Sequence, residues 1–217
     1  MSSAPVEVYG RALTEAAGEA GHVSFRAVGD DGSQRRLPLR RWLGRVPIEE
    51  LELLERASSP VLDVGCGPGR HLAGLARLGV PGLGLDIAPH AVALARARGC
   101  RALRRSVFDR LPNEGSWGSA LLLDGNVGIA GDPERLLGRL AALLRPGGTV
   151  FAEFEPPQAR SREVRIRVET LDEVSDWFPW AWVSVDDVDR ISRSAGLDVA
   201  AIWTGRGRWF AQLDVPR

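Results

Sequence analysis

The chain has 217 residues, of which 44% are hydrophobic and 26% charged, and this composition is ordinary for one folded domain. Basic and acidic side chains balance at 28 each, so no net charge favours binding to nucleic acid or to an anionic membrane. The chain contains no lysine, which excludes Schiff-base catalysis and the phosphate-binding loop that ends in lysine.

Residues 1–60 are expected to form a cap or lid segment that does not fold independently, because they carry little apolar surface. Residues 6–17 have helical character. Residues 22–28 and 33–39 are two short strand-like runs around Asp30-Asp31-Gly32, a sequence typical of a hairpin turn. A second helix is expected from Pro47 to Ala57.

From residue 61 onward, strands and helices alternate, which predicts a parallel sheet with helices on both faces. Residues 198–213 predict an antiparallel hairpin at the end of that sheet, because Gly205-Arg206-Gly207 is too short for a crossover. The expected fold class is therefore α/β: a doubly wound, seven-stranded, mostly parallel sheet with a C-terminal antiparallel hairpin and an N-terminal helix and hairpin as a cap. The expected strands are 61–65, 82–87, 102–107, 119–124, 149–154, 198–203 and 208–213, and the expected helices are 70–78, 89–98, 133–144 and 185–195.

The strongest motif is a strand that enters a glycine-rich turn and opens a helix, Val61-Leu62-Asp63-Val64-Gly65-Cys66-Gly67-Pro68-Gly69-Arg70. Ligands of open parallel sheets bind beyond the carboxyl ends of the strands. Glycines let a ligand approach the backbone, and the helix N-terminus offers free N–H groups to an anion. The dinucleotide fingerprint G-x-G-x-x-G is not met, because arginine stands at position 70 where a count from Gly65 requires glycine. Asp86, at the end of the second strand, is placed to accept hydrogen bonds from ribose hydroxyls.

The D-x-G-x-G-x-G pattern of residues 63–69 closely resembles the first motif of class I, Rossmann-like S-adenosylmethionine-dependent methyltransferases, of the short bacterial small-molecule type. Asp86-Ile87-Ala88-Pro89 resembles the family's second motif, and Leu144-Arg145-Pro146-Gly147-Gly148 resembles its approach to the fifth strand. The resemblance implies a methyltransferase domain over residues 61–217, S-adenosylmethionine as the cofactor, and methyl transfer to a small-molecule acceptor. Whether the acceptor atom is O, N or C stays open.

The resemblance also implies roles for single residues. The glycine-rich turn would line the methionine half of the cofactor, Asp86 would hold the ribose, and Ile87 would pack on the adenine. Val107, Phe108 and Asp109 are alternatives for the adenine contact. Tyr9, on the first helix, would either close over the cofactor carboxylate or be a partly buried core residue. The expected cofactor-binding residues are Tyr9, Asp63, Gly65, Cys66, Gly67, Gly69, Asp86, Ile87, Val107, Phe108 and Asp124.

The acceptor side is expected beyond the fourth and fifth strands. Asp124 and Asn126 are the expected catalytic residues, with Asp124 acting as a base, as an orienting group, or merely as the cap of a turn. Residues 177–182 contain three tryptophans, which would either wall an apolar pocket or cover a sheet edge. The expected pocket residues are Trp42, Glu153, Trp177 and Trp182.

Two functions from other classes remain as alternatives: a non-catalytic S-adenosylmethionine-binding protein, and a nicotinamide-dependent oxidoreductase. No metal site is expected, because the three histidines lack metal-ligand spacing. A cytoplasmic location is expected from three features: no secretory signal, no run of about 20 apolar residues, and two cysteines interpreted as reduced thiols. The sequence leaves the oligomeric state open.

Overall fold

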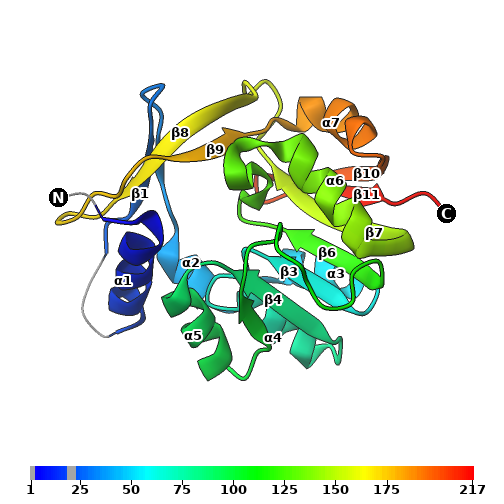
Figure 1. Cartoon of the computed structure of the whole chain (residues 1–217), viewed down its shortest axis with the longest axis horizontal. Helices are drawn as coiled ribbons and strands as arrows, with labels where there is room; N and C mark the ends of the chain where they lie inside the picture. The colour runs from blue at the N-terminus through cyan, green and yellow to red at the C-terminus, as the bar shows by residue number, and fades with distance from the viewer. Residues whose placement is uncertain (1–2, 19–22) are drawn as a thin grey trace.

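The computed structural model describes residues 3–18 and 23–217. Within these residues the main sheet has seven strands in the order β10-β11-β7-β6-β3-β4-β5 (Figure 1). The five strands from β7 to β5 are parallel, whereas β11 runs antiparallel to β7 and β10 antiparallel to β11. The strands are β3 (Val61–Val64), β4 (Gly82–Asp86), β5 (Ala102–Arg104), β6 (Trp117–Leu122), β7 (Leu144–Phe154), β10 (Asp198–Gly205) and β11 (Arg208–Asp214).

The order of the strands reverses beside β3, since β4 and β5 lie on one side of it and β6 and β7 on the other. Loops that leave neighbouring strands in opposite directions open a crevice at the carboxyl ends, where ligands of such sheets bind. The glycine-rich turn follows β3 and therefore lies at this crevice.

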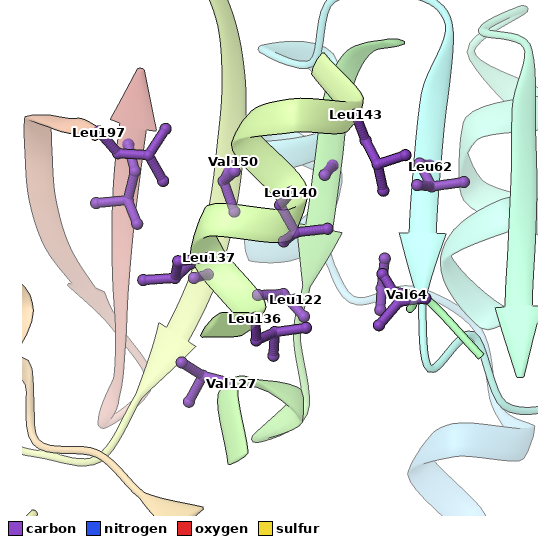
Figure 2. Close-up of a cluster of buried hydrophobic side chains, with 14 of the residues drawn as sticks. Leu62, Val64, Leu122, Val127, Leu136, Leu137, Leu140, Leu143, Val150 and Leu197 are labelled. Carbon is purple, nitrogen blue, oxygen red and sulfur yellow. The ribbon is translucent and has the colours of Figure 1, made fainter. Parts of the chain in front are cut away.

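Helices cover both faces of the main sheet, because successive residues of a strand point to opposite faces. On one face, Leu62 and Val64 of β3 pack with Leu122 of β6 and Val150 of β7 against α6 (Figure 2). The α6 side chains in this cluster recur at helical spacing and are Leu136, Leu137, Leu140 and Leu143. The helices are α3 (Ile48–Glu55), α4 (Arg70–Arg77), α5 (Pro89–Ala97), the 3₁₀ segment η1 (Asn126–Gly131), α6 (Pro133–Leu143), η2 (Val185–Asp187) and α7 (Val188–Ser194).

On the opposite face, α3, α4 and α5 supply the buried apolar residues. Leu54 of α3 and Leu75 of α4 belong to the same cluster as Val61 and Leu121 of the sheet, and all four are fully buried. Helix α3 is thus part of the main body of the molecule, although it lies within the first 60 residues.

A second, four-stranded antiparallel sheet, called here the small sheet, has the order β2-β1-β8-β9. It joins distant parts of the chain, since Arg26 of β1 pairs with Glu169 of β8. Helix α1 (Pro5–Ala17) packs against α2 (Leu39–Leu43), α5 and β8. We call α1, α2 and the small sheet the lid (Figure 1). The strands of the small sheet are β1 (Arg26–Gly29), β2 (Gln34–Arg36), β8 (Arg162–Glu169) and β9 (Phe178–Trp182).

The expected fold class is confirmed: the sheet has seven strands, is mostly parallel, ends in an antiparallel hairpin and carries helices on both faces. The helix expected at residues 185–195 is instead the short segment η2 followed by α7. The expected strand 22–28 is observed as β1, and His22 lies outside the described residues. The small sheet was not predicted as a unit.

Candidate active site

The glycine-rich turn adopts backbone angles that favour glycine. Gly65, Gly67 and Gly69 have φ angles of 69°, 53° and 82°, and Gly69 is the N-cap of α4. A Cβ atom on Gly65 would lie 2.6 Å from the side-chain nitrogen of Asn126, and one on Gly67 would lie 3.1 Å from the hydroxyl of Tyr9. The turn therefore has no room for side chains on the surface that faces these two residues.

Asp86 links the glycine-rich turn to the start of α5. Its carboxylate accepts hydrogen bonds from the N–H groups of Gly67 at 2.9 Å and of Ala88 at 2.8 Å. Burial raises the pKa of Asp86, and these backbone donors oppose the rise. Beside it, Ile87 is 56% exposed, an unusual state for a large apolar residue at the carboxyl end of a buried strand.

A cavity of about 540 Å³ lies between this turn and the lid. Both catalytic candidates, Asp124 and Asn126, line it. Most of the expected cofactor residues and two of the expected pocket tryptophans line it as well: Tyr9, Gly65, Cys66, Gly67, Asp86, Ile87, Val107, Phe108, Trp42 and Trp182. Residues on separate parts of the sequence thus meet at one cavity.

Four of the expected site residues do not line the cavity, and neither does Asp109, the third alternative for the adenine contact. Asp63 is buried below the turn, and Gly69 faces Ala95 and Cys100. Glu153 turns its carboxylate to Arg208 and to the backbone N–H of Asp124. Trp177 precedes β9, and its ring lies 5.0 Å from the guanidinium of Arg167.

The β9 residues Phe178 and Trp180, which line the cavity with Trp182, were not among the candidates. The signal was present in the sequence, because alternate residues of a strand point to one face and positions 178, 180 and 182 are all aromatic. Neighbouring rings contact edge to face, with centroids 6.2 Å apart for Phe178 and Trp180 and 6.4 Å apart for Trp180 and Trp182.

Tyr9 extends from α1 to the glycine-rich turn. Its ring stacks on Phe25 and meets Trp42 edge to face, each with centroids 6.0 Å apart. Burial raises the pKa of its hydroxyl, and nearby acidic groups such as Asp86 raise it further. The hydroxyl is therefore a proton donor at neutral pH and lies against the turn that a ligand would approach.

Asn126 holds the turn from the opposite side. Its side-chain amide donates to the carbonyls of Val64 at 2.9 Å and of Gly65 at 3.0 Å. The preceding Asp124 has a φ of 59°, and its N–H donates to Glu153 at 2.6 Å. These bonds fix the loop after β6 against the loop after β3.

Buried ion pairs form a cluster behind the cavity, with Glu50 of α3 at the centre. The Glu50 carboxylate is fully buried and contacts Arg41 at 3.0 Å, His71 at 3.0 Å, Arg70 and Arg208. No single helix or strand supplies these partners, since they come from α2, α4 and β11. Although burial favours protonation, the contacts with His71, Arg70 and Arg208 hold the pKa of Glu50 far below its usual value.

Asp124 lines the cavity together with Arg70 and His71 of the cluster. Its carboxylate lies 2.8 Å from Arg41, 2.6 Å from Arg70 and 3.3 Å from Arg208. Burial would raise the pKa of this carboxyl, but His71 and these three guanidinium groups lower it. Asp124 is consequently a weak base, and this geometry favours an orienting role.

Glu50 was missed in the sequence, although a signal existed. Three and four residues after it come Leu53 and Leu54, which share its face of the helix. An acid on the apolar face of a helix is a buried charge that requires partners. Local pattern does not identify those partners, because they lie far apart in the sequence; they are Arg41, Arg70 and Arg208.

Asp63 differs from Glu50 in its environment. One of its carboxylate oxygens has no partner among the described residues, and the other lies 3.9 Å from Nδ1 of His71. Burial raises the pKa of Asp63 to about 6, against the effect of His71.

The described residues contain no group of three His, Cys, Asp or Glu side chains placed to hold a metal ion. Nor does any helix in residues 3–18 and 23–217 combine the length and apolarity needed to cross a membrane.

Part of the chain is similar to known methyltransferases. Residues 61–148 match the family model described as a methyltransferase domain. Ubiquinone biosynthesis O-methyltransferase of Xanthomonas axonopodis pv. citri is 33% identical over 104 residues, which cover 45% of this chain and 44% of that protein. Trans-aconitate 2-methyltransferase of Paracidovorax citrulli is 29% identical over 153 residues, covering 66% and 56% respectively. The chain spans about half the length of these curated relatives.

A solved structure matches over nearly the whole chain. The S-adenosylmethionine-dependent methyltransferase from Bacteroides fragilis, solved with S-adenosyl-L-homocysteine, superposes with a TM-score of 0.80 at 22% identity. The match covers 99% of this chain and 97% of that one, so both the main sheet and the lid belong to the shared fold.

Proposed function

We propose that the protein transfers a methyl group from S-adenosylmethionine to a small-molecule acceptor, because residues 61–148 match a methyltransferase domain and the fold matches that of a solved S-adenosylmethionine-dependent methyltransferase. The single observation that carries this proposal is the glycine-rich turn, which faces a lidded cavity at the point where strand order reverses. The names of the two curated relatives describe small-molecule methyltransferases, which supports an acceptor of that class.

The residues present fit S-adenosylmethionine. A Cβ atom on Gly67 would occupy the gap between the turn and Tyr9, so glycine keeps this gap open for the methionine end of the cofactor. Asp86 supplies carboxylate oxygens for the ribose hydroxyls. Exposed Ile87, with Val107 and Phe108, supplies an apolar slot for the adenine ring.

When bound, S-adenosylmethionine supplies a methyl group activated on a sulfonium. The protein's task is then to hold the acceptor in line with that methyl and to exclude water. Asn126 fixes the glycine-rich turn, while Asp124 orients the loop after β6. Trp42 and the aromatic residues of β9 close the cavity from the lid side.

We also propose that residues 1–60, which supply α1, α2, β1 and β2 to the lid and α3 to the main body, act only together with residues 61–217. The lid is built in part from β8 and β9, so the cap segment lacks half of its own sheet when alone. We place the enzyme in the cytoplasm and its acceptor among small metabolites, since the balanced charge provides no general attraction for nucleic acid.

The test is mass spectrometry of a metabolite extract incubated with the protein and methyl-labelled S-adenosylmethionine. A labelled product that requires the protein supports methyl transfer. Cofactor binding without any labelled product across extracts would favour a non-catalytic cofactor-binding protein. Binding of NADH in place of S-adenosylmethionine would favour an oxidoreductase.

A further inference from the structure

The charged groups near the acceptor side of the cavity are already paired within the protein. Arg70 is 2% exposed at its side chain and contacts Glu50 and Asp124. Asp124 itself is held by three guanidinium groups. Neither side chain has spare charge for an ionised acceptor, and an uncompensated charge is costly to bury.

The lid side of the cavity offers apolar walls. Phe25, Leu37, Ile166 and Phe178 line it together with the tryptophans of β9. Arg35, whose guanidinium lies 4.1 Å from the ring centroid of Trp182, pairs with Glu155 at 2.7 Å, and neither charge lines the cavity. Arg41 of α2 is paired with Asp124 and Glu50.

An exposed guanidinium does border the cavity on its other side. Arg105 follows β5, next to the proposed adenine slot, and donates to the carbonyl of Arg110. It is therefore placed beside the cofactor site and away from the aromatic walls of the lid.

Among the described lining residues, Asp86 accepts the N–H groups of Gly67 and Ala88 and is assigned to the ribose, and the other ionisable groups offer no proton acceptor suited to neutral pH. Glu50 holds Nε2 of His71 at 3.0 Å, and Nδ1 of the same ring lies 3.9 Å from the buried carboxylate of Asp63. Tyr9 and Cys66 hold their protons because burial raises both pKa values, and Asp124 is a weak base. A hydroxyl acceptor, which must lose its proton before or during attack, would receive no help from these groups.

We propose that the acceptor is a neutral nitrogen carried on a flat, apolar molecule, an inference that rests on the proposed methyl transfer. The nitrogen lone pair forms the new N–C bond as the C–S bond breaks, and the electron pair of that bond remains on sulfur. Positive charge moves from sulfur to nitrogen, so total charge is conserved and no base is needed in the step. Where the nitrogen carried hydrogen, the product then releases a proton to water.

The aromatic side chains that line the cavity can stabilise the positive charge that develops on the nitrogen. A cation over the face of an indole or phenol ring is stabilised by the ring quadrupole, and most strongly where water is excluded. Trp42 lies beside Tyr9, which contacts the glycine-rich turn, and follows directly on Arg41, which contacts Asp124. Its ring is thus near the point where the transferred methyl is expected.

The experiment uses three probes on one ring system: 2-naphthylamine, 2-naphthol and 2-naphthoate. Tryptophan fluorescence is titrated with each probe at pH 7.5, on protein saturated with S-adenosylhomocysteine. The two uncharged probes should bind similarly, and naphthoate should bind at least tenfold more weakly. If naphthoate binds as tightly as the amine, the inference that the pocket prefers an uncharged acceptor is wrong.

Methyl transfer separates nitrogen from oxygen. With S-adenosylmethionine at pH 7.5, naphthylamine should give an N-methyl product, and naphthol should react about 100-fold more slowly because base assistance is missing. Equal rates for the two probes would overturn the proposal, as would the absence of N-methyl product from saturating amine. His22→Ala should leave the naphthol rate unchanged. A lower rate of naphthol methylation in this variant would identify a base outside the described residues.

Trp42 variants test the aromatic contribution. Trp42→Leu should lower kcat for the amine about tenfold, and Trp42→Phe should restore most of it, with S-adenosylhomocysteine affinity unchanged in both. Equal kcat in the two variants would contradict stabilisation by the ring. If an acid or alcohol is methylated but the amine is not, the proposed function stands and this inference fails. If neither S-adenosylmethionine nor S-adenosylhomocysteine binds, the proposed function itself fails.

Discussion

Arg41 of the lid lies 2.8 Å from Asp124 at the rim of the cavity, and the same guanidinium reaches Glu50 at 3.0 Å. This residue therefore ties α2, and with it Trp42, to the main body of the molecule. Because about a third of the Arg41 side chain is exposed, the contact is weaker than a fully buried pair.

Replacing Arg41 should loosen the lid without unfolding the protein. Arg41→Gln removes a contact worth about 1 kcal/mol, so amide exchange in residues 39–43 should accelerate about fivefold. Hydrogen-exchange mass spectrometry measures this directly. Arg45→Gln, an exposed arginine four residues later, is the matched control. Equal acceleration in both variants would show that the contact does not hold the lid.

Glu50→Gln should destabilise the whole domain by about 3–5 kcal/mol, because it leaves buried guanidinium groups without their counter-charge. Glu52→Gln on the exposed side of the same helix should change stability by less than about 0.5 kcal/mol. Urea unfolding at pH 7 gives both values. A loss below 1 kcal/mol for Glu50→Gln would mean that the cluster relaxes around the missing charge.

The Glu50 contribution should also disappear in acid. Its pKa in the folded protein is lowered, so the stabilisation is present above the unfolded value of 4.5 and is lost as pH falls. The difference in unfolding free energy between wild type and Glu50→Gln should therefore shrink below pH 4.5. A difference that is constant from pH 7 to pH 3 would contradict the charged state assigned to Glu50.

Asp63 should give the opposite pH dependence. Its pKa rises from 3.8 to about 6 on folding, so the folded protein holds a proton that the unfolded chain releases between these values. Stability from this group falls as pH rises through that window, by about 3 kcal/mol in total. Asp63→Asn should remove this pH dependence, so the unfolding free energy of the variant should rise relative to that of wild type between pH 4 and pH 6.5. Parallel unfolding curves over this range would show that Asp63 is ionised throughout.

Local pattern was sufficient for the main sheet and for much of the site. The glycine-rich turn and the loop after β6 each follow a strand that the local sequence pattern predicts, and Asp86 ends such a strand. Parallel strands bring their carboxyl ends together at one edge of the sheet. The lid hairpin could also be predicted from local pattern, because Asp30-Asp31-Gly32 lies between two short strands.

The remaining features depend on pairing at long range. β1 pairs with β8 across more than a hundred residues, and no local signal selects that partner. The Glu50 cluster likewise draws its arginines from separate elements. Glu153 was expected at the pocket because it lies at the end of the fifth strand, but it contacts Arg208 instead. Trp177 was expected there as part of the tryptophan stretch, but it precedes β9 and does not line the cavity.

Asp86→Ala should weaken S-adenosylmethionine binding more than tenfold, because a hydrogen bond to a charged group contributes about 1.5–3 kcal/mol. The variant also leaves the N–H groups of Gly67 and Ala88 without their acceptor, so part of the loss comes through the turn. Equilibrium dialysis gives the affinity, and the melting temperature checks the fold. Affinity equal to wild type would remove Asp86 from the site.

The most direct measurement is calorimetric titration of S-adenosylmethionine into wild type, Gly67→Val and Gly79→Val. Both glycines have positive φ, but a Cβ atom on Gly79 meets nothing within 4 Å, whereas one on Gly67 meets Tyr9 at the turn. Wild type and Gly79→Val should bind with the same affinity, and Gly67→Val should show no binding while its circular dichroism remains native. Unchanged affinity in Gly67→Val would contradict the assignment of the glycine-rich turn as the cofactor site.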